Sequence, residues 1–128
     1  MKDSIKIGII AGEHSGDILG ENFLKALKKI KNVEMYGVGG PRMESQGLKS
    51  EFDFNNLNIM GLVEPMLNYS KIMSYKNDLC NLFLDKKIDI FIGVDSPDFN
   101  MQIQKKLKRN SDIKTVQLVT PSIWAWRK

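Results

Sequence analysis

The chain has 128 residues, of which 42% are hydrophobic and 27% charged, a composition typical of a globular domain rather than a disordered chain. Its one cysteine, Cys80, and its one histidine, His14, exclude an internal disulfide framework and a zinc site made only of these residue types. The first apolar run contains Lys6 and ends at Glu13, too short for a signal peptide, and no run is long enough to span a membrane. We therefore expect a cytoplasmic domain.

Basic residues outnumber acidic ones by 19 to 15, which gives a net charge of +4. The surplus gathers near the ends of predicted helices, at Lys25, Lys28, Lys29, Lys31, Lys86, Lys87, Lys105, Lys106, Lys108 and Arg109. Cations there complement the helix dipole, so a solvated surface explains them, and an anionic membrane surface is the next interpretation. No aromatic residues alternate with these lysines, which argues against a nucleic-acid partner.

The first part of the chain predicts alternating strands and helices. Residues 5–11 are rich in isoleucine and flanked by glycine, which is typical of a buried strand. Residues 17–30 carry apolar side chains at helical spacing, and we expect Ser15 to cap that helix. A second strand is predicted over residues 33–38 and a short helix over residues 41–46.

The middle of the chain is less regular. Phe52 and Phe54 alternate as they would in a strand, and the residues from there to Gly61 are expected to form a loop. Residues 62–84 predict one long helix or two shorter ones, because Pro65 lies in the first turn or kinks the chain.

The last part predicts a strand over residues 88–94, a helix over residues 97–109 capped by Ser96, and a strand over residues 114–119. Strands of unbroken apolar character that alternate with helices favour a parallel sheet covered on both faces, so the fold class is α/β and Rossmann-like. No helix follows the last strand, so we expect residues 1–128 to be the front portion of a longer protein, or a partner to cover this end.

Three polar stretches follow predicted strands: "GEHSGD" at residues 12–17, "DSPDFN" at residues 95–100 and "TPSIWAW" at residues 120–126. Ligands of open α/β sheets bind beyond the carboxyl ends of the strands, so we expect these stretches to line one crevice. Trp124 and Trp126 share a face of an extended chain, where they pack against a second domain, lie at the edge of the core or stack on a sugar, with packing as the default interpretation.

The glycines of the first stretch do not have the spacing of a dinucleotide-binding or P-loop motif. Glu13 and Asp17 would repel a phosphate and suit sugar hydroxyls better, although the stretch can also be a tight turn with capping residues. Asp95 ends a strand and can act as a general base, whereas the helix dipole alone accounts for Asp98.

A surplus of apolar side chains marks residues 62–73. It comprises Val63, Met66, Leu67, Tyr69, Ile72 and Met73, which Lys71 and Lys76 accompany. Such a segment either contacts a membrane interface, with its lysines on anionic head groups, or packs within the protein.

Together, "AGEHSGDILG", "GVGGPRM", "MGLVEP", "IGVDSPDFN" and "PSIWAWRK" resemble the successive motifs of the lipid-A-disaccharide synthase family, from about Ile5 to Lys128. The resemblance implies the N-terminal, acceptor-side half of a GT-B glycosyltransferase. That enzyme is inverting and transfers 2,3-diacylglucosamine from its UDP conjugate to the 6-hydroxyl of 2,3-diacylglucosamine 1-phosphate, a step of lipopolysaccharide synthesis. It also implies peripheral association with the cytoplasmic side of the inner membrane and no metal or other cofactor. Whether the chain is a monomer or a homo-oligomer stays open.

On this resemblance Asp95 is the expected catalytic base. The expected substrate-binding residues are Gly12, Glu13, Ser15, Gly16, Asp17, Asp98, Asn100, Ser122 and Trp124. Family members continue into a second, UDP-binding half, so we expect these 128 residues to be inactive alone. Two alternatives stay open, a stand-alone Rossmann-like nucleotide-binding module and a membrane-surface adaptor without chemistry.

Overall fold

The structure, a computed structural model, describes residues 3–54, 69–95 and 97–119. Its sheet has four strands, β1 (Ser4–Ala11), β2 (Asn32–Val38), β3 (Ile90–Val94) and β4 (Lys114–Leu118), in the order β2-β1-β3-β4. All three strand pairs are parallel, with Ile7 opposite both Met35 and Ile90. This confirms the predicted parallel sheet and the Rossmann-like α/β fold class.

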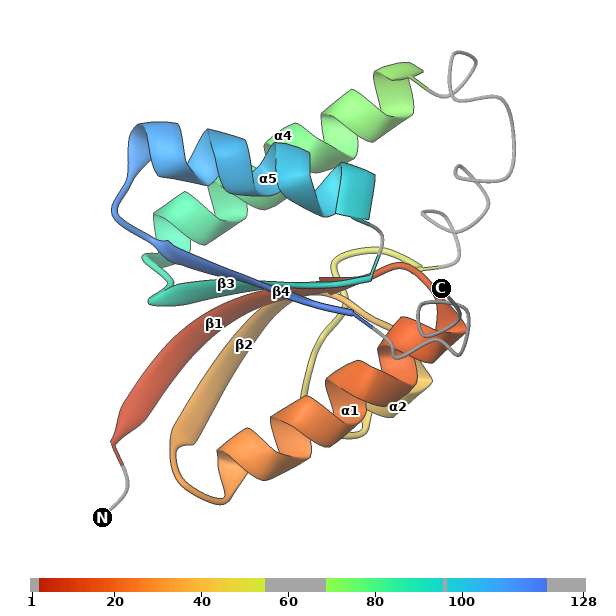
Figure 1. The fold of residues 1–128 in the computed structure, drawn as a ribbon, viewed down its shortest axis with the longest axis vertical. Helices are drawn as coiled ribbons and strands as arrows, with labels where there is room; N and C mark the ends of the chain where they lie inside the picture. Colours follow the sequence, from red (N-terminus) through yellow and green to blue (C-terminus); the bar gives the residue numbers. More distant parts are fainter. Residues whose placement is uncertain (1–2, 55–68, 96, 120–128) are drawn as a thin grey trace, which may run out of the picture.

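Helices cover both faces of the sheet (Figure 1). Helices α1 (His14–Lys28) and α2 (Pro41–Glu44) lie on one face, and α4 (Tyr69–Lys86) and α5 (Pro97–Asn110) lie on the other. The predicted helices are therefore found, with ends shifted by a few residues. None of the helices in the described ranges is both long and apolar enough to cross a membrane.

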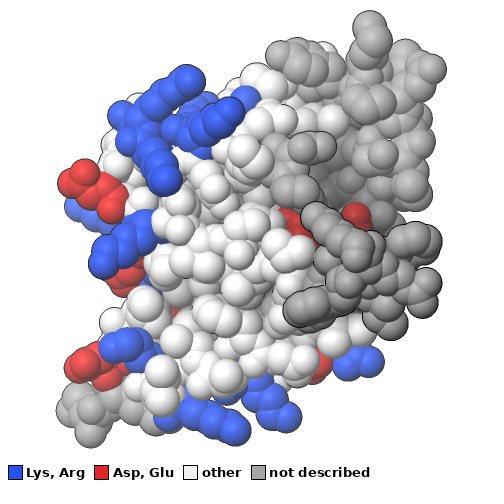
Figure 2. Space-filling view, in the orientation of Figure 1, with Lys and Arg blue, Asp and Glu red and all other residues white. Residues whose placement is uncertain are grey.

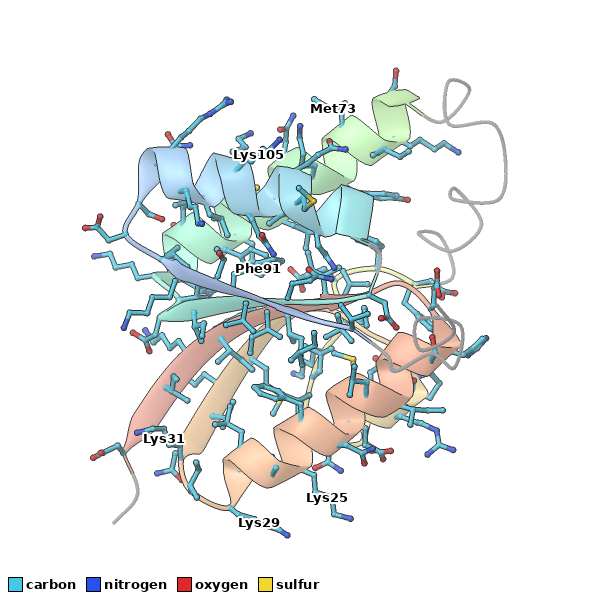
Figure 3. The ribbon with its side chains drawn as sticks, viewed as in Figure 1. Lys25, Lys29, Lys31, Met73, Phe91 and Lys105 are labelled. Carbon is cyan, nitrogen blue, oxygen red and sulfur yellow. The ribbon has the colours of Figure 1, made fainter. Side chains whose placement is uncertain are left out.

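The alternation of side chains along β1 and β3 divides the core into two halves. Ile7, Ile9, Ile92 and Val94 belong to the cluster under α1, whereas Phe91 belongs to the cluster under α4 and α5. Figure 3 shows Phe91 between β3 and the helices on that side. These five side chains are at most 1% exposed, and so is Ile10 of β1, which belongs to the cluster under α4 and α5. Both strands are therefore buried on both faces, as a central parallel pair must be.

Close packing on the α4 side depends on a glycine in β1. A Cβ atom at Gly8 would lie 2.7 Å from the Phe83 ring and 2.8 Å from Ile88 Cδ1. Phe83 is fully buried and packs on Phe91, with ring centroids 5.5 Å apart. The glycine in the "IKIGIIA" run therefore makes room for an aromatic ring of α4.

The prediction of a strand at Phe52 and Phe54 is wrong. Ser50 makes only an isolated bridge to Gly37, and residues 51–54 form bends and a turn. Phe52 stacks on Tyr75 of α4 at a centroid distance of 4.1 Å, and Phe54 is buried in the same core cluster. The two phenylalanines thus pack a loop onto the core and do not belong to a strand of the sheet.

Several sequence expectations fall outside the described residues. These are the loop up to residue 61, the first part of the helix predicted over residues 62–84, the Ser96 cap and residues 120–126. The described part of that helix begins at Tyr69 and continues to Lys86.

Cys80 of α4 is fully buried, and this burial raises the pKa of its thiol although Lys106 and Lys76 oppose the shift. A raised pKa means less thiolate at pH 8, and the thiolate is the form that reacts. We expect iodoacetamide to alkylate Cys80 at least about tenfold more slowly in the folded chain than in the guanidinium-unfolded chain. Equal rates, followed by mass spectrometry, would contradict the buried position of this thiol.

Candidate active site at the carboxyl edge of the sheet

The central strands β1 and β3 are neighbours, but the chain continues from them to opposite sides of the sheet, to β2 and to β4. Such a switch point leaves a gap between the two following loops, where ligands of this fold class bind. Gly12 and Glu13 follow β1 at this point, and Asp95 follows β3. The first two polar stretches therefore meet at one place, as predicted.

Asp95 leaves β3 in the left-handed backbone conformation, with a φ of 49°. Its side chain faces the start of α1, where Ser15 Oγ donates a hydrogen bond of 3.4 Å to Asp95 Oδ2. Gly16 is buried beside it, and a Cβ atom at Gly16 would lie 3.5 Å from the same carboxylate oxygen. The strand-end carboxylate thus meets the first turn of the helix that follows β1.

The prediction that Ser15 caps α1 is wrong. The helix begins at His14, its N-cap residue is Glu13, and within the described residues no side chain makes a cap hydrogen bond there. The turn after β1 is so short that Ser15 already lies inside the first turn of α1. From that position its hydroxyl contacts Asp95 instead of a backbone N–H of its own helix.

Asp17 has a different role from the other acids of the stretch. It is only 2% exposed, and its carboxylate accepts three backbone hydrogen bonds at the start of α2. Oδ1 accepts from the N–H of Gly40 at 2.9 Å and of Met43 at 3.0 Å, and Oδ2 accepts from the N–H of Arg42 at 3.0 Å. Asp17 therefore ties α1 to α2 by satisfying the free N–H groups at the N-terminus of α2.

Glu13 and His14 are exposed at the same edge, while Gly12 is buried. The His14 ring meets the ring of Phe54 edge to face, with centroids 5.2 Å apart. Sequence reasoning missed this pair, because nothing in the spacing of two residues 40 positions apart indicates that they meet. Their contact brings the loop after β2 and α2 up to the start of α1.

Asn100 of α5 is fully buried, and its Nδ2 donates a hydrogen bond of 2.8 Å to the backbone carbonyl of Asp95. Gln117 of β4 donates to the same carbonyl through Nε2 at 2.9 Å. Sequence reasoning also missed Gln117. The available signal was a polar residue in the middle of the apolar run "TVQLV".

Comparison with known proteins shows the family to which this chain is related. A family model described as lipid-A-disaccharide synthetase matches residues 7–128. The chain belongs to this family. It is 48% identical over 128 residues to the lipid-A-disaccharide synthase of Aliivibrio salmonicida, covering 99% of this chain and 33% of the relative. It is 46% identical over 125 residues to that of Pseudoalteromonas translucida (97% and 32%), and 44% identical over 126 residues to that of Blochmanniella pennsylvanica (98% and 32%). The chain spans about a third of the length of these relatives.

The other predicted site residues of this family member are described only in part. Asp98 lies in the first turn of α5, and its side chain is outside the described part, as are Ser122, Trp124, Val63, Met66 and Leu67. Tyr69 begins α4, again without a described side chain. Ile72 and Met73 are half-buried on α4, and Figure 3 shows Met73 on the side of this helix that faces away from the sheet.

The charges are distributed unevenly. Figure 2 shows lysine and arginine side chains mainly over the end of α5 and along α1, with acidic side chains among them on the side where the strands begin, and further acidic side chains at the edge where the strands end. Figure 3 shows Lys25 in the last part of α1, Lys29 and Lys31 around the turn from α1 to β2, and Lys105 on the outer side of α5. Over the described ranges, no group of three or more His, Cys, Asp or Glu side chains could hold a metal ion.

We expect Asp17→Ala to lower the free energy of unfolding by about 3 kcal/mol, because it leaves buried N–H groups at the start of α2 without acceptors. Urea denaturation followed by circular dichroism measures this loss. Glu13→Ala is the matched control, since Glu13 is exposed and makes no cap hydrogen bond, and it should change stability by less than about 0.5 kcal/mol. Equal stability of the two variants would show that Asp17 does not hold α2.

Proposed function

We propose that this chain contributes the acceptor side of a lipid-A-disaccharide synthase, with Asp95 as its catalytic base. The observation that carries the proposal is the position of the Asp95 carboxylate at the switch point of the sheet, against Ser15 of α1. Family membership supports the reaction class. Residues 1–128 would then be one part of a GT-B enzyme whose other part makes most of the contacts to UDP.

In the proposed step, the Asp95 carboxylate takes the proton of the 6-hydroxyl of 2,3-diacylglucosamine 1-phosphate. The 6-oxygen forms a bond to C1 of the donor sugar, and the bond from C1 to the UDP oxygen breaks. UDP leaves with that electron pair, and attack from the opposite face inverts C1. As the family resemblance implies, we propose this step without a metal or other cofactor.

The first turn of α1 is the proposed binding surface for the acceptor sugar. Glu13 and Ser15 are exposed there and offer oxygen atoms to sugar hydroxyls, while Gly12 and Gly16 are buried, so we propose that they shape the turn that presents these oxygen atoms. Asp98, Ser122 and Trp124 are proposed to complete the surface. For Asp17 and Asn100, the described contacts are with the protein backbone, so we propose that they support the site from behind.

Both proposed substrates are acylated, so we also propose that the chain works at the cytoplasmic surface of the inner membrane. The feature that supports this membrane proposal is the start of α4, where Ile72 and Met73 are half-buried and Lys71 is exposed. Apolar side chains beside a lysine suit the boundary between acyl chains and anionic head groups.

We expect Asp95→Asn to lower kcat at least about 100-fold, because the amide cannot accept the proton. The assay is disaccharide formation by a chimera in which this chain replaces the matching third of the Aliivibrio salmonicida synthase. Asp112→Asn is the control, since this exposed acid lies between α5 and β4 at the other end of the sheet. Full activity of Asp95→Asn would refute the catalytic role.

Tight UDP binding by the 128-residue chain alone would favour the alternative function, a stand-alone nucleotide-binding module.

We expect Met73→Asp to weaken binding to phosphatidylglycerol-containing vesicles about tenfold. The change places a charge on the apolar surface of α4 that we propose enters the membrane interface. Ile18→Asp is the control, because Ile18 is 44% exposed on α1, on the opposite face of the sheet. Vesicle sedimentation measures both. Equal binding of Met73→Asp and the unmodified chain would contradict a membrane role for this part of α4.

A further inference from the structure

We propose that Gln117 and Asn100 are positioning residues that hold Asp95 in the backbone conformation from which its carboxylate reaches α1. The catalytic part of this inference rests on the proposed function of Asp95; the structural part does not. Neither amide needs to touch substrate for this role. Both act on the backbone carbonyl of Asp95.

The conformation of Asp95 is one that needs support. At a φ of 49° the Cβ atom of a residue other than glycine crowds the backbone, which costs about 1–2 kcal/mol. Such a residue persists only where its surroundings fix it more strongly than they would fix an extended residue. The support for Asp95 therefore has to be found among its neighbours.

Three hydrogen bonds supply this support, and all of them involve the backbone of Asp95. Its N–H donates to the carbonyl of Leu118 in β4 at 2.8 Å. Its carbonyl accepts from Asn100 Nδ2 at 2.8 Å and from Gln117 Nε2 at 2.9 Å, so two side-chain amides occupy both lone pairs of one oxygen. Asp95 is thus held from α5 and from β4 at once.

A further contact sets the orientation of the Gln117 amide. Gln104 Nε2 of α5 donates a 3.4 Å hydrogen bond to Gln117 Oε1, so the nitrogen end of this amide is the one that faces Asp95. An oxygen in the place of that nitrogen would repel the carbonyl of Asp95. The role of Gln117 therefore depends on its being an amide rather than a carboxylate.

Gly93 makes room for both amides. A Cβ atom there would lie 2.5 Å from Gln117 Oε1 and 2.8 Å from Asn100 Cβ. Gly93 is two residues before Asp95 in β3, so its missing side chain leaves space directly behind the turn. The glycine, the two amides and the left-handed aspartate form one unit, which we call the Asp95 clamp.

The discriminating variant is Gln117→Glu, which keeps the side-chain size and turns one donor into an acceptor. Amide hydrogen exchange of the 128-residue chain, read residue by residue by NMR, should show exchange of the Asp95 N–H at least about tenfold faster. The N–H groups of Ile9 and Ile92 in the central strands should keep their protection, because the sheet does not depend on the clamp. Gln102→Glu, the same change on an exposed residue of α5, should leave Asp95 unaltered.

If Gln117→Glu loses protection throughout the sheet, Gln117→Met gives the decisive measurement, because it removes the donor without adding a charge. Gln117→Glu decides if the rest of its sheet stays protected, and Gln117→Met decides otherwise. In the deciding variant, faster exchange confined to Asp95 supports the clamp and unchanged exchange of Asp95 overturns it. A loss of protection over the whole sheet in both variants also overturns it.

The activity arm uses the chimera with the Aliivibrio salmonicida synthase. Gln117→Glu should lower kcat up to about 100-fold with little change in KM, because a base displaced by about 1 Å loses its alignment. Combined with Asp95→Asn, it should cause no further loss, whereas a general folding defect would add to it. If Asp95→Asn is fully active while Asp95 still exchanges faster in Gln117→Glu, the clamp stands and the proposed base is wrong.

Discussion

The burial of β1 on both of its faces is the constraint on which the rest of this structure depends. Ile7, Ile9, Ile10 and Ala11 are completely removed from solvent, so helices must lie above and below them. A parallel strand in that position needs a crossover on each side, and the chain meets this need by pairing β1 with β2 and with β3. The switch point at the end of β1 follows directly, and it is there that Asp95 meets α1.

Three acids at this edge have the same functional group and three different environments. Asp17 is buried and bound by three backbone N–H groups, Glu13 is exposed, and Asp95 is partly buried beside a hydroxyl. The carboxylate that holds α2 has its acceptor positions taken by the protein, so it is poorly placed to serve a substrate. The geometry thus separates the structural acid from those that can serve a ligand, although in the sequence they look alike.

The parts of the fold that could be predicted from the sequence are those that depend on local pattern. The isoleucine run of β1, the proline that opens α5 and the short helix at "PRM" each carry their signal within a few residues. The same reasoning failed at Phe52, where an alternating pattern arose from packing on Tyr75. It also failed at Ser15, because the length of the turn after β1 decides where α1 begins.

The site shows the same division. That Asp95 lies near the first stretch follows from the rule for parallel sheets, so the sequence was sufficient to predict it. The hydrogen bonds of Gln117 and Asn100 to its carbonyl could not be predicted, because they join β4 and α5 through side chains whose directions only the packed structure determines. A glutamine within an apolar strand indicates a buried polar partner without saying which one.

The tight space behind β3 has a consequence for how homologous sequences vary. Positions 93, 100 and 117 share one small volume, in which a methyl group at Gly93 would already meet both amides. A larger residue at position 93 is tolerable only where a smaller or differently shaped side chain stands at one of the other two. Across the family these three positions should therefore covary as a set, although they lie on three different elements and 24 residues separate the first from the last.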